Sequence, residues 1–336
     1  MALRAHARAS FRAPPISIEA PVVLFAIASR RLALQRALAV TCAALALACA
    51  GRGDARRDST PPASGGSEST IGVDDFGDTV ALTPAKRIVS LSPMTTELLF
   101  TIGAGPLLVG RTEYDVWPAA AKSVPSVGPG IRPNVERILA ARPDLVVLYA
   151  ANDNRGAARA LRAAGVRTVA LKSDHLGDFA RAARFLGAVS GRDSAAQQAL
   201  DSVHATLDRV ARSVRGLPKP RVLWFLWDNP PMVLGSGSYQ SELLAVAGGE
   251  NVYRERREPA AQVSMEDILT RDPQIVFADP GADIQLKTSA RWGGIAARRG
   301  WRIVTIDDTL LNRPGVTLGM AAVSLARALH PGWRGP

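Results

Sequence analysis

A repeated segment constrains the fold of this chain more than any other feature of its sequence. The residues PNVERILAARPDLVVLYA at 133–150 and VSMEDILTRDPQIVFADP at 263–280 share one plan: Glu-x-Ile-Leu, a spacer, a proline and an apolar run. A carboxylate ahead of an apolar turn indicates the start of a helix, and a short apolar run after a proline indicates a strand. The sequence therefore predicts the same helix–strand unit in each half of the chain.

The rest of the chain extends this alternation. Glu97-Leu98-Leu99 and Glu242-Leu243-Leu244 each lead into a glycine-containing turn. The expected strands are 87–92, 107–111, 145–150, 167–171, 221–227, 274–279 and 302–307. The expected helices include 95–103, 134–141, 154–164, 240–247, 264–271 and 316–329. Alternating strands and helices are typical of α/β folds with mostly parallel sheets, here as two Rossmann-like lobes.

A single apolar stripe marks the segment between the two halves, residues 193–215. Its apolar residues recur at steps of three and four, the period of a helix: Leu200, Val203, Leu207, Val210 and Val214. Asp193 or Ser194 can cap its start, and GLPKP at 216–220 ends it. The sequence therefore predicts a single long α-helix of roughly 30 Å that joins the two lobes.

The N-terminus has the features of an export signal. Three arginines precede a small-and-apolar run at 37–48, which is too short to span a bilayer as a stable helix. The tetrad Ala-Leu-Ala-Cys that ends at Cys49 resembles a bacterial lipobox, although Ala replaces the usual Leu three residues before the cysteine. In that interpretation Cys49 is lipidated and becomes the mature N-terminus; plain secretion is the alternative.

These features divide the chain into five parts. They are a signal or lipoprotein signal region at 1–49, a flexible tether at 50–80, an N-terminal α/β lobe at 81–190, a linking helix at 191–216 and a C-terminal α/β lobe at 217–336. The net charge of +11 is partly explained by residues 1–48, which hold six arginines and one glutamate. The remaining charge is scattered, without the basic stripe of a nucleic-acid binder, so nucleic acid is not an expected partner.

Seven motifs, in this order and at these spacings, resemble the substrate-binding proteins of ABC importers for cobalamin, haem and ferric siderophores. They are RIVSLSPMTTELLFTIGAG, EYDVWP, PNVERILAARPDLVV, DNPP, AGGENVY, QVSMEDIL and NRPG. The resemblance covers about Arg87 to Leu329 and implies a ligand cleft between the lobes, with an ABC permease and ATPase as partners. Cobalamin-binding members are the most similar, so a vitamin B12-like corrinoid is the expected ligand and a ferric siderophore or haem the alternative.

The resemblance also implies a location and an assembly state. We expect a monomer in the periplasm or at the cell surface, held at the membrane by a lipid anchor. Neither a cofactor nor catalysis is expected.

Aromatic residues near the ends of expected strands are the candidate ligand contacts. Tyr114 and Trp117 follow one strand, and Tyr149 and Trp227 close two others, where loops meet a cleft at the carboxyl ends of strands. The resemblance implies that aromatic residues at such positions flank the ligand, and we expect Arg313 of the NRPG motif to contact an acidic or amide group of the ligand. The alternatives are an aromatic ring packed under a loop and, for Arg313, a solvated loop charge.

Two positions depart from the cobalamin-binding pattern. Gly130 and Ala260 stand where the resemblance implies a large aromatic residue. Their small size thins the expected aromatic wall. The nearby Arg111 and Arg132 would instead suit an anionic siderophore, which is the alternative ligand.

Glu136 and Glu266 are the candidate docking residues, because they open the two copies of the repeated segment. Each follows an expected helix cap, Asn134 or Ser264. A carboxylate there also complements the helix dipole, which is worth ~0.3–1 kcal/mol. The resemblance implies that each glutamate instead meets an arginine on the permease.

Two other functional classes are disfavoured. A zinc or manganese receptor needs three or four converging histidines and carboxylates, but after export only His175, His204 and His330 remain, in separate segments. The GSGS at 235–238 lacks the Gly-Lys-Ser/Thr ending of a phosphate loop, and no G-x-S-x-G motif occurs. Neither a metal site nor an enzyme is therefore expected.

Overall fold

The computed structural model describes residues 71–288, 292–306 and 308–336. The expected signal region, Cys49 and most of the expected tether lie outside the described residues. At the end of the expected tether, β1 (Ile71–Val73) and β2 (Thr79–Ala81) form an antiparallel pair, so folded structure begins before residue 81. Of the helices in the described ranges, none combines the length and the apolar character needed to cross a membrane.

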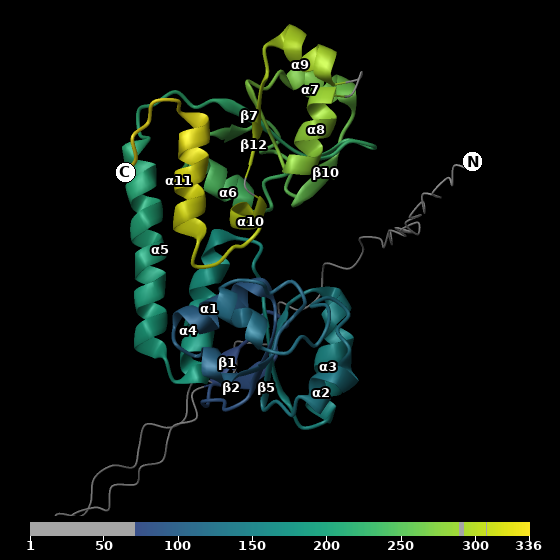
Figure 1. Cartoon of the computed structure of the whole chain (residues 1–336), viewed down its shortest axis with the longest axis vertical. Coiled ribbons are helices and arrows are strands. Elements are labelled where there is room, and N and C mark those ends of the chain that lie inside the picture. The colour runs from purple at the N-terminus through teal and green to yellow at the C-terminus, as the bar shows by residue number, and fades with distance from the viewer. Residues whose placement is uncertain (1–70, 289–291, 307) are drawn as a thin grey trace, which may run out of the picture. The chain divides into compact units, whose positions relative to one another are not determined.

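The first large sheet has four parallel strands in the order β4-β3-β5-β6. They are β3 (Ile88–Leu91), β4 (Leu108–Gly110), β5 (Leu145–Tyr149) and β6 (Arg167–Leu171). The helices are α1 (Pro93–Thr101), α2 (Val135–Ala140), α3 (Arg155–Ala163) and α4 (Leu176–Ser190), with 3-10 turns at Gly105–Leu107, Ala119–Ser123 and Asn152–Asn154. Helices α1 and α4 cover one face and α2 and α3 the other (Figure 1).

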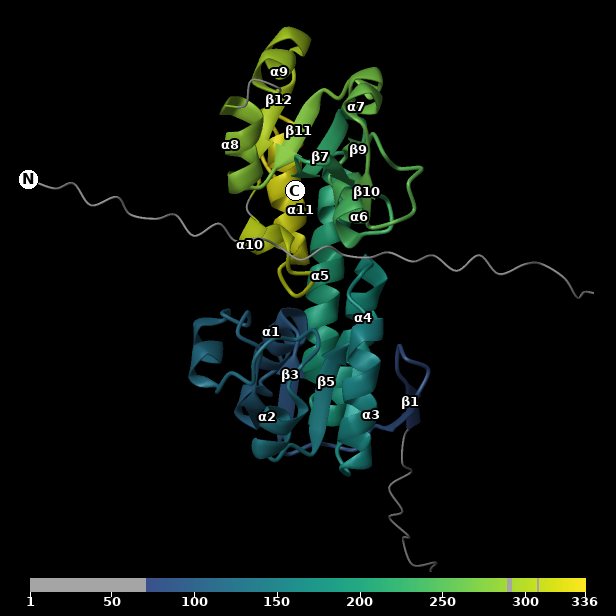
Figure 2. The same cartoon turned by 90° about the vertical axis from the view of Figure 1, so that its right-hand side faces the viewer.

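The second large sheet is mixed. Its strands are β7 (Arg221–Trp227), β8 (Met232–Leu234), β9 (Glu250–Asn251), β10 (Ala260–Gln262), β11 (Ile275–Ala278) and β12 (Arg302–Thr305). The strand order is β10-β8-β7-β11-β12, with β9 beside β7. Strand β8 runs antiparallel to both of its neighbours, β7 and β10. Strands β7, β11 and β12 are parallel and lie side by side in Figure 2. The helices are α6 (Tyr239–Val246), α7 (Met265–Arg271), α8 (Pro280–Thr288), α9 (Gly293–Arg299), α10 (Asp308–Leu311) and α11 (Leu318–Leu329).

The repeated segment forms α2 and β5 in one copy and α7 and β11 in the other. The Asn134 side chain accepts a hydrogen bond from the Arg137 amide at 2.9 Å, and the Ser264 side chain accepts one from the Asp267 amide at 3.1 Å. These bonds satisfy amides that the first helical turn leaves without partners. The expected α/β fold with mostly parallel sheets, and its repeated helix–strand unit, are confirmed.

Helix α5 (Asp193–Ser213) lies between the two sheets in the sequence and contacts both α4 and α11. Most of its expected stripe is buried, with Leu200 2% and Val210 0% exposed, while Leu207 is partly buried. The expected cap was wrong: Arg192 is the N-cap residue, it makes no side-chain capping bond, and Asp193 is already helical. Burial of the stripe, rather than a strong cap, therefore stabilises this helix.

Residues alternate between hydrophobic clusters along each strand, since successive side chains point to opposite faces of a sheet. In β5, Leu145 and Val147 join the largest cluster, while Val146 and Leu148 join a second one with α2 and α3. The largest cluster continues through α1, α4, α5, α6 and α11 to the second sheet. Helix α5 is therefore packed into a core shared by both halves of the chain.

This packing predicts the effect of truncating the α5 stripe. We expect Leu200→Ala to lower the free energy of unfolding by about 2–5 kcal/mol, the usual range for a buried leucine. Gln198→Ala, on the exposed side of the same helix, should change it by less than about 0.5 kcal/mol. Urea unfolding measures both changes. If the two variants lowered the free energy of unfolding equally, the burial of the stripe would be contradicted.

Candidate ligand-binding site

A pocket of about 450 Å³ opens at the carboxyl ends of the first parallel sheet. Its lining comes from the ends of β3 and β5 and from the loops after β3, β4 and β6, and includes Leu91, Thr112, Tyr114, Gly130, Ile131 and Tyr149. Ligands of open α/β sheets bind at this edge, where the connecting loops diverge. The structure thus places two of the sequence-predicted aromatic residues, Tyr114 and Tyr149, in one pocket.

Tyr149 is held by its hydroxyl group, which donates a hydrogen bond to Asp174 Oδ1 at 2.5 Å. Burial raises the pKa of the Tyr149 hydroxyl above its usual range, and the hydrogen bond to Asp174 and its negative charge act in the same direction. The phenol therefore stays neutral and its ring has a fixed orientation. A fixed, half-buried ring loses little entropy when a flat ligand packs against it.

Tyr114 is 66% exposed and lies on a loop that is tied to α1. The buried Asp115 carboxylate accepts hydrogen bonds from Thr96 Oγ1 at 2.6 Å, from the Thr112 amide at 3.1 Å and from Thr112 Oγ1 at 2.5 Å. Burial raises the pKa of Asp115, while these hydrogen bonds lower it. A buried polar group with satisfied partners fixes the backbone around it, so Tyr114 projects from a rigid base.

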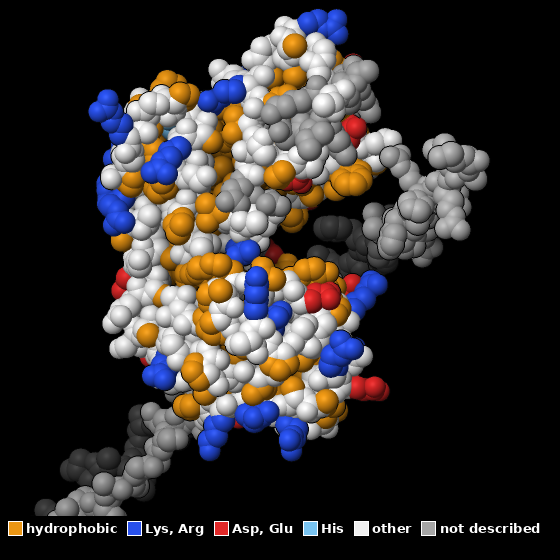
Figure 3. Space-filling model, in the orientation of Figure 1, with side chains coloured by type: hydrophobic (Ala, Val, Ile, Leu, Met, Phe, Trp, Pro, Cys, Tyr) orange, Lys and Arg blue, Asp and Glu red, His pale blue; other side chains and the backbone are white. Residues whose placement is uncertain are grey.

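Other exposed apolar side chains adjoin Tyr114 in the chain. Val116 and Trp117 are 44% and 42% exposed. In Figure 3, hydrophobic side chains gather at the upper edge of the part formed by residues 71–190. Trp117 does not line the pocket, although it belongs to the same loop as Tyr114. An exposed group of large apolar side chains is a common feature of ligand-binding surfaces.

The two tryptophans of β7 differ in their surroundings. Trp224 is 3% exposed and packs edge-on against Phe277, so it belongs to the core. Trp227 is 57% exposed, and its Nε1 donates to the Asn229 carbonyl at 3.1 Å. Neither Trp227 nor Arg313 lines the pocket at the first sheet.

Gly130 has a steric reason for its lack of a side chain. A Cβ atom there would lie 2.4 Å from the main-chain oxygen of Leu91, far inside van der Waals contact. An aromatic residue at this position would require the main chain to move. The pocket is therefore lined by backbone at the place where the resemblance implied a ring.

The two arginines near Gly130 are engaged with protein acceptors. Arg111 Nε donates to the Ala121 carbonyl at 2.8 Å, and its Nη1 donates to the Thr112 carbonyl at 2.7 Å. Arg132 Nε donates to Asp153 Oδ2 at 2.9 Å. Both guanidinium groups brace loops beside the pocket, which weakens the interpretation that they bind an anionic ligand.

Glu97 is a buried carboxylate that sequence reasoning placed only in a helix. Its side chain is 0% exposed, and neither oxygen has a hydrogen-bond partner of normal geometry among the described residues. Burial raises the pKa of Glu97 to about 7, and the positive charge of Arg313 and the main chain of Thr317 oppose that rise more weakly. The available signal was a glutamate inside the apolar run TTELLF.

Glu97 should make stability depend on pH. Its pKa is about 7 in the folded protein against 4.5 for the free side chain, so the folded state binds the extra proton between these values. The contribution of Glu97 to stability is then greatest below about pH 4.5, falls as the pH rises to about 7 and stays constant at higher pH. We expect Glu97→Gln to raise the free energy of unfolding at pH 8 by on the order of 2 kcal/mol and to flatten this decline. Glu258→Gln, at an exposed position, is the control and should leave the pH dependence of stability unchanged. The same unchanged dependence in Glu97→Gln would contradict the raised pKa of Glu97.

The Glu-Leu-Leu repeat has a structural counterpart. Glu242, on α6, accepts hydrogen bonds from His175 Nδ1 at 2.6 Å and from the Leu176 amide at 2.8 Å, at the start of α4. Glu97, on α1, lies beside Gly315, where an added Cβ would be 3.4 Å from the Glu97 carboxyl carbon. Each repeated glutamate therefore contacts a loop from the other half of the sequence.

The candidate docking residues Glu136 and Glu266 are both exposed, in the first turns of α2 and α7. Neither carboxylate takes part in an ion pair or hydrogen bond with any residue that the structure describes. An unpaired, exposed carboxylate at a helix start remains available to a partner.

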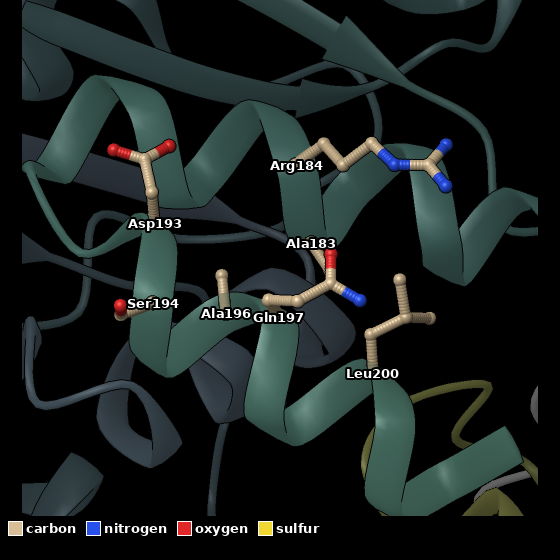
Figure 4. A pocket seen from close by; sticks show the side chains of 7 residues that line it. All are labelled: Ala183, Arg184, Asp193, Ser194, Ala196, Gln197 and Leu200. Carbon is tan, nitrogen blue, oxygen red and sulfur yellow. The ribbon is translucent and has the colours of Figure 1, made fainter.

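A second cavity, of about 330 Å³, lies between α4 and α5 (Figure 4). It is lined by side chains such as Arg184, Asp193 and Gln197, and by no sequence-predicted site residue. Over the described ranges, no group of three or more His, Cys, Asp or Glu residues is placed to hold a metal ion. The pocket at the first sheet is the candidate site because it brings together the sequence-predicted Tyr114 and Tyr149.

Comparison with known proteins places the chain in a family. The sequence profile described as periplasmic binding protein matches residues 88–310. The vitamin B12-binding protein of Salmonella typhimurium is 31% identical over 250 residues, which cover 74% of this chain and 92% of that protein. The solved periplasmic vitamin B12-binding protein of Vibrio cholerae is 25% identical, with a TM-score of 0.63, and the match covers 74% of this chain and 97% of that one. A periplasmic haem-binding protein from Pseudomonas aeruginosa has the same identity and TM-score, over 75% and 95% of the two chains. This chain belongs to the periplasmic binding protein family.

Proposed function

We propose that the protein captures cobalamin, or a similar corrinoid, outside the cytoplasm and delivers it to an ABC importer. The observation that carries the proposal is the pocket flanked by Tyr114 and Tyr149 at the carboxyl ends of the first sheet. It lies in a chain whose relatives include vitamin B12-binding proteins. Aromatic side chains bury large areas against a flat macrocycle, so binding and release rather than catalysis is the function.

The second side of the ligand site is proposed to come from the second half of the chain. In this arrangement the two large sheets belong to two lobes joined by α5, and the ligand lies in a cleft between them. Trp227 supports this arrangement, because a tryptophan that is 57% exposed at the end of β7 has no role in the core. Arg313, beside the buried Glu97, is proposed to contact a polar group at the rim of the corrin.

Haem or a ferric siderophore is the second candidate ligand. The observation that favours it is Gly130, where the main chain leaves no space for the aromatic residue expected of a corrinoid site. A haem-binding protein is also among the solved structures similar to this chain. Arg111 and Arg132 give an anionic ligand little support, since both already have protein partners.

Delivery is proposed to depend on Glu136 and Glu266, one from each half of the chain. Complementary charges across an interface speed association and fix orientation. A permease built from two like subunits would present one arginine site to each glutamate. We further propose that the protein works as a monomer in the periplasm or at the cell surface, with a lipid on Cys49 as its anchor.

A titration tests the proposed ligand. Purified protein is titrated with cyanocobalamin, haemin and a ferric hydroxamate siderophore while tryptophan fluorescence is recorded. We expect saturable quenching by cyanocobalamin at the lowest concentration of the three. Saturation by haemin or the siderophore alone would favour the second candidate, and no response to any of them would contradict both.

A further inference from the structure

Asn154 is a buried amide beneath the pocket. Its side chain is 0% exposed, so it cannot touch a ligand. Nδ2 donates hydrogen bonds to the carbonyls of Gly130 at 2.9 Å and Tyr149 at 3.0 Å, and Oδ1 accepts one from the Arg132 amide at 3.0 Å. Both donors and an acceptor of one amide group are thus used on main-chain atoms.

These three bonds join residues 130–132 to Tyr149, and both segments contribute to the lining of the pocket. Gly130 and Ile131 form one wall, and Tyr149 forms another. The fully buried amide lies under both walls and fixes the backbone of each. No other side chain among the described residues is hydrogen-bonded to both segments.

The wall at 130–132 needs such a restraint. Arg132 has φ +51°, in the left-handed region that residues other than glycine rarely adopt. Its ion pair with Asp153 is exposed on both sides and contributes little. The adjacent Gly130 packs its main chain against the Leu91 carbonyl. A backbone held in a sparsely populated conformation persists only where its surroundings determine it, and such positions cluster at ligand sites.

We infer that Asn154 is a positioning residue for ligand capture: it holds the 130–132 wall and the Tyr149 wall in the binding arrangement before the ligand arrives. The inference rests on the proposed function for its ligand and on the structure for its geometry. A protein whose binding-competent arrangement is only partly populated binds more weakly in proportion to that fraction. Loss of a positioning residue therefore slows association, whereas loss of a contact residue speeds dissociation.

The first test needs no ligand. In amide hydrogen exchange on the purified protein, we expect Asn154→Ala to speed exchange at the amides of residues 130–132 and 149–152 about tenfold or more, because three hydrogen bonds to the main chain are lost. Exchange in β7 and β11 should stay at the wild-type rate, which shows that the variant is folded. Asn152→Ala is the matched control, since Asn152 is exposed and its side chain has no hydrogen bond among the described residues.

The second test measures binding rates with cyanocobalamin by stopped-flow fluorescence. For Asn154→Ala we expect association to slow about tenfold while dissociation stays within about twofold. Asn152→Ala should match the wild type in both rates. A variant with lower melting temperature but wild-type association would show a purely structural role and overturn the inference, as would faster dissociation with unchanged association.

A rescue variant sharpens the second test. Glycine adopts positive φ without strain, so Arg132→Gly should reduce the need for the restraint. We expect Arg132→Gly in the Asn154→Ala background to associate several-fold faster than Asn154→Ala alone. Asn154→Ser, which keeps one hydroxyl, is expected to lie between wild type and alanine and serves if Asn154→Ala does not fold. The inference would be overturned if Arg132→Gly did not restore association in Asn154→Ala and Asn154→Ser did not lie between wild type and alanine.

The two tests separate this inference from the proposed function. If the wild-type protein does not bind cyanocobalamin, the proposed ligand is wrong, and the exchange experiment still decides whether Asn154 holds the two walls. If the wild type binds but Asn154→Ala changes neither exchange nor association, the inference is wrong and the proposed function is unaffected.

Discussion

Replacing Glu136 and Glu266 together by lysine is expected to abolish uptake of cobalamin by cells that depend on this protein. Ligand affinity of the purified double variant should stay within about twofold of wild type, because neither side chain lines the pocket. The reason is electrostatic: lysines in place of the two exposed carboxylates, one at the start of α2 and one at the start of α7, would be repelled by the arginine sites that we propose on the permease. Uptake of labelled cyanocobalamin and a binding titration measure the two effects separately.

The control for this experiment must match the change in net charge. Asp201 and Asp208 are both exposed on α5, and their double replacement by lysine changes the net charge equally. We expect this control to retain most of its uptake. Each single variant at Glu136 or Glu266 should be partly active, because one contact remains. Wild-type uptake by the double glutamate variant would contradict the docking role.

Truncating Tyr114 is expected to have the largest effect on ligand affinity. The ring is 66% exposed, so it is free to be covered by a ligand, and the rigid Asp115 network holds it in place. A buried aromatic anchor contributes about 2 kcal/mol, so Tyr114→Ala should weaken cyanocobalamin binding roughly 30-fold. The loss should come mainly from faster dissociation, in contrast to the effect expected at Asn154.

Two further variants show whether the ring itself carries this effect. Tyr114→Phe keeps the ring and should bind within about threefold of wild type. Tyr149→Phe also keeps a ring but loses the hydrogen bond to Asp174, so we expect a small loss. Calorimetric titration gives the affinities. If Tyr114→Ala bound cyanocobalamin with wild-type affinity, Tyr114 would not be a ligand contact.

The local pattern of the sequence was enough to predict most of the helices and the strands β3 to β7, β11 and β12, but not β1, β2, β8, β9 and β10. β3 to β7, β11 and β12 lie in short apolar runs, and α2 and α7 have side-chain caps, so adjacent residues specify each element. Helix α4 was missed because Gly177 and Gly187 resemble helix breakers. Gly187 is there for packing: an added Cβ would lie 2.8 Å from Ala196 Cβ on α5. A close approach of two helices is a tertiary cause that no local pattern contains.

The residues of the candidate site also fall into those that the sequence predicts and those that only the fold reveals. Tyr114 and Tyr149 could be predicted, since an aromatic residue at the end of a strand is visible in the sequence. Asn154 and Asp115 could not, because their roles depend on hydrogen bonds to segments brought near only by the fold. Glu97 was visible as an acid in an apolar run, but its burial beside Arg313 depends on contact between the two halves of the chain.

A crystal structure of the protein with bound cyanocobalamin would show where the ligand lies. We expect the corrin to lie against the rings of Tyr114 and Tyr149, within about 4.5 Å, with Trp227 covering its other side. A corrin bound elsewhere, such as in the groove between α4 and α5, with both tyrosines free of contact, would contradict it.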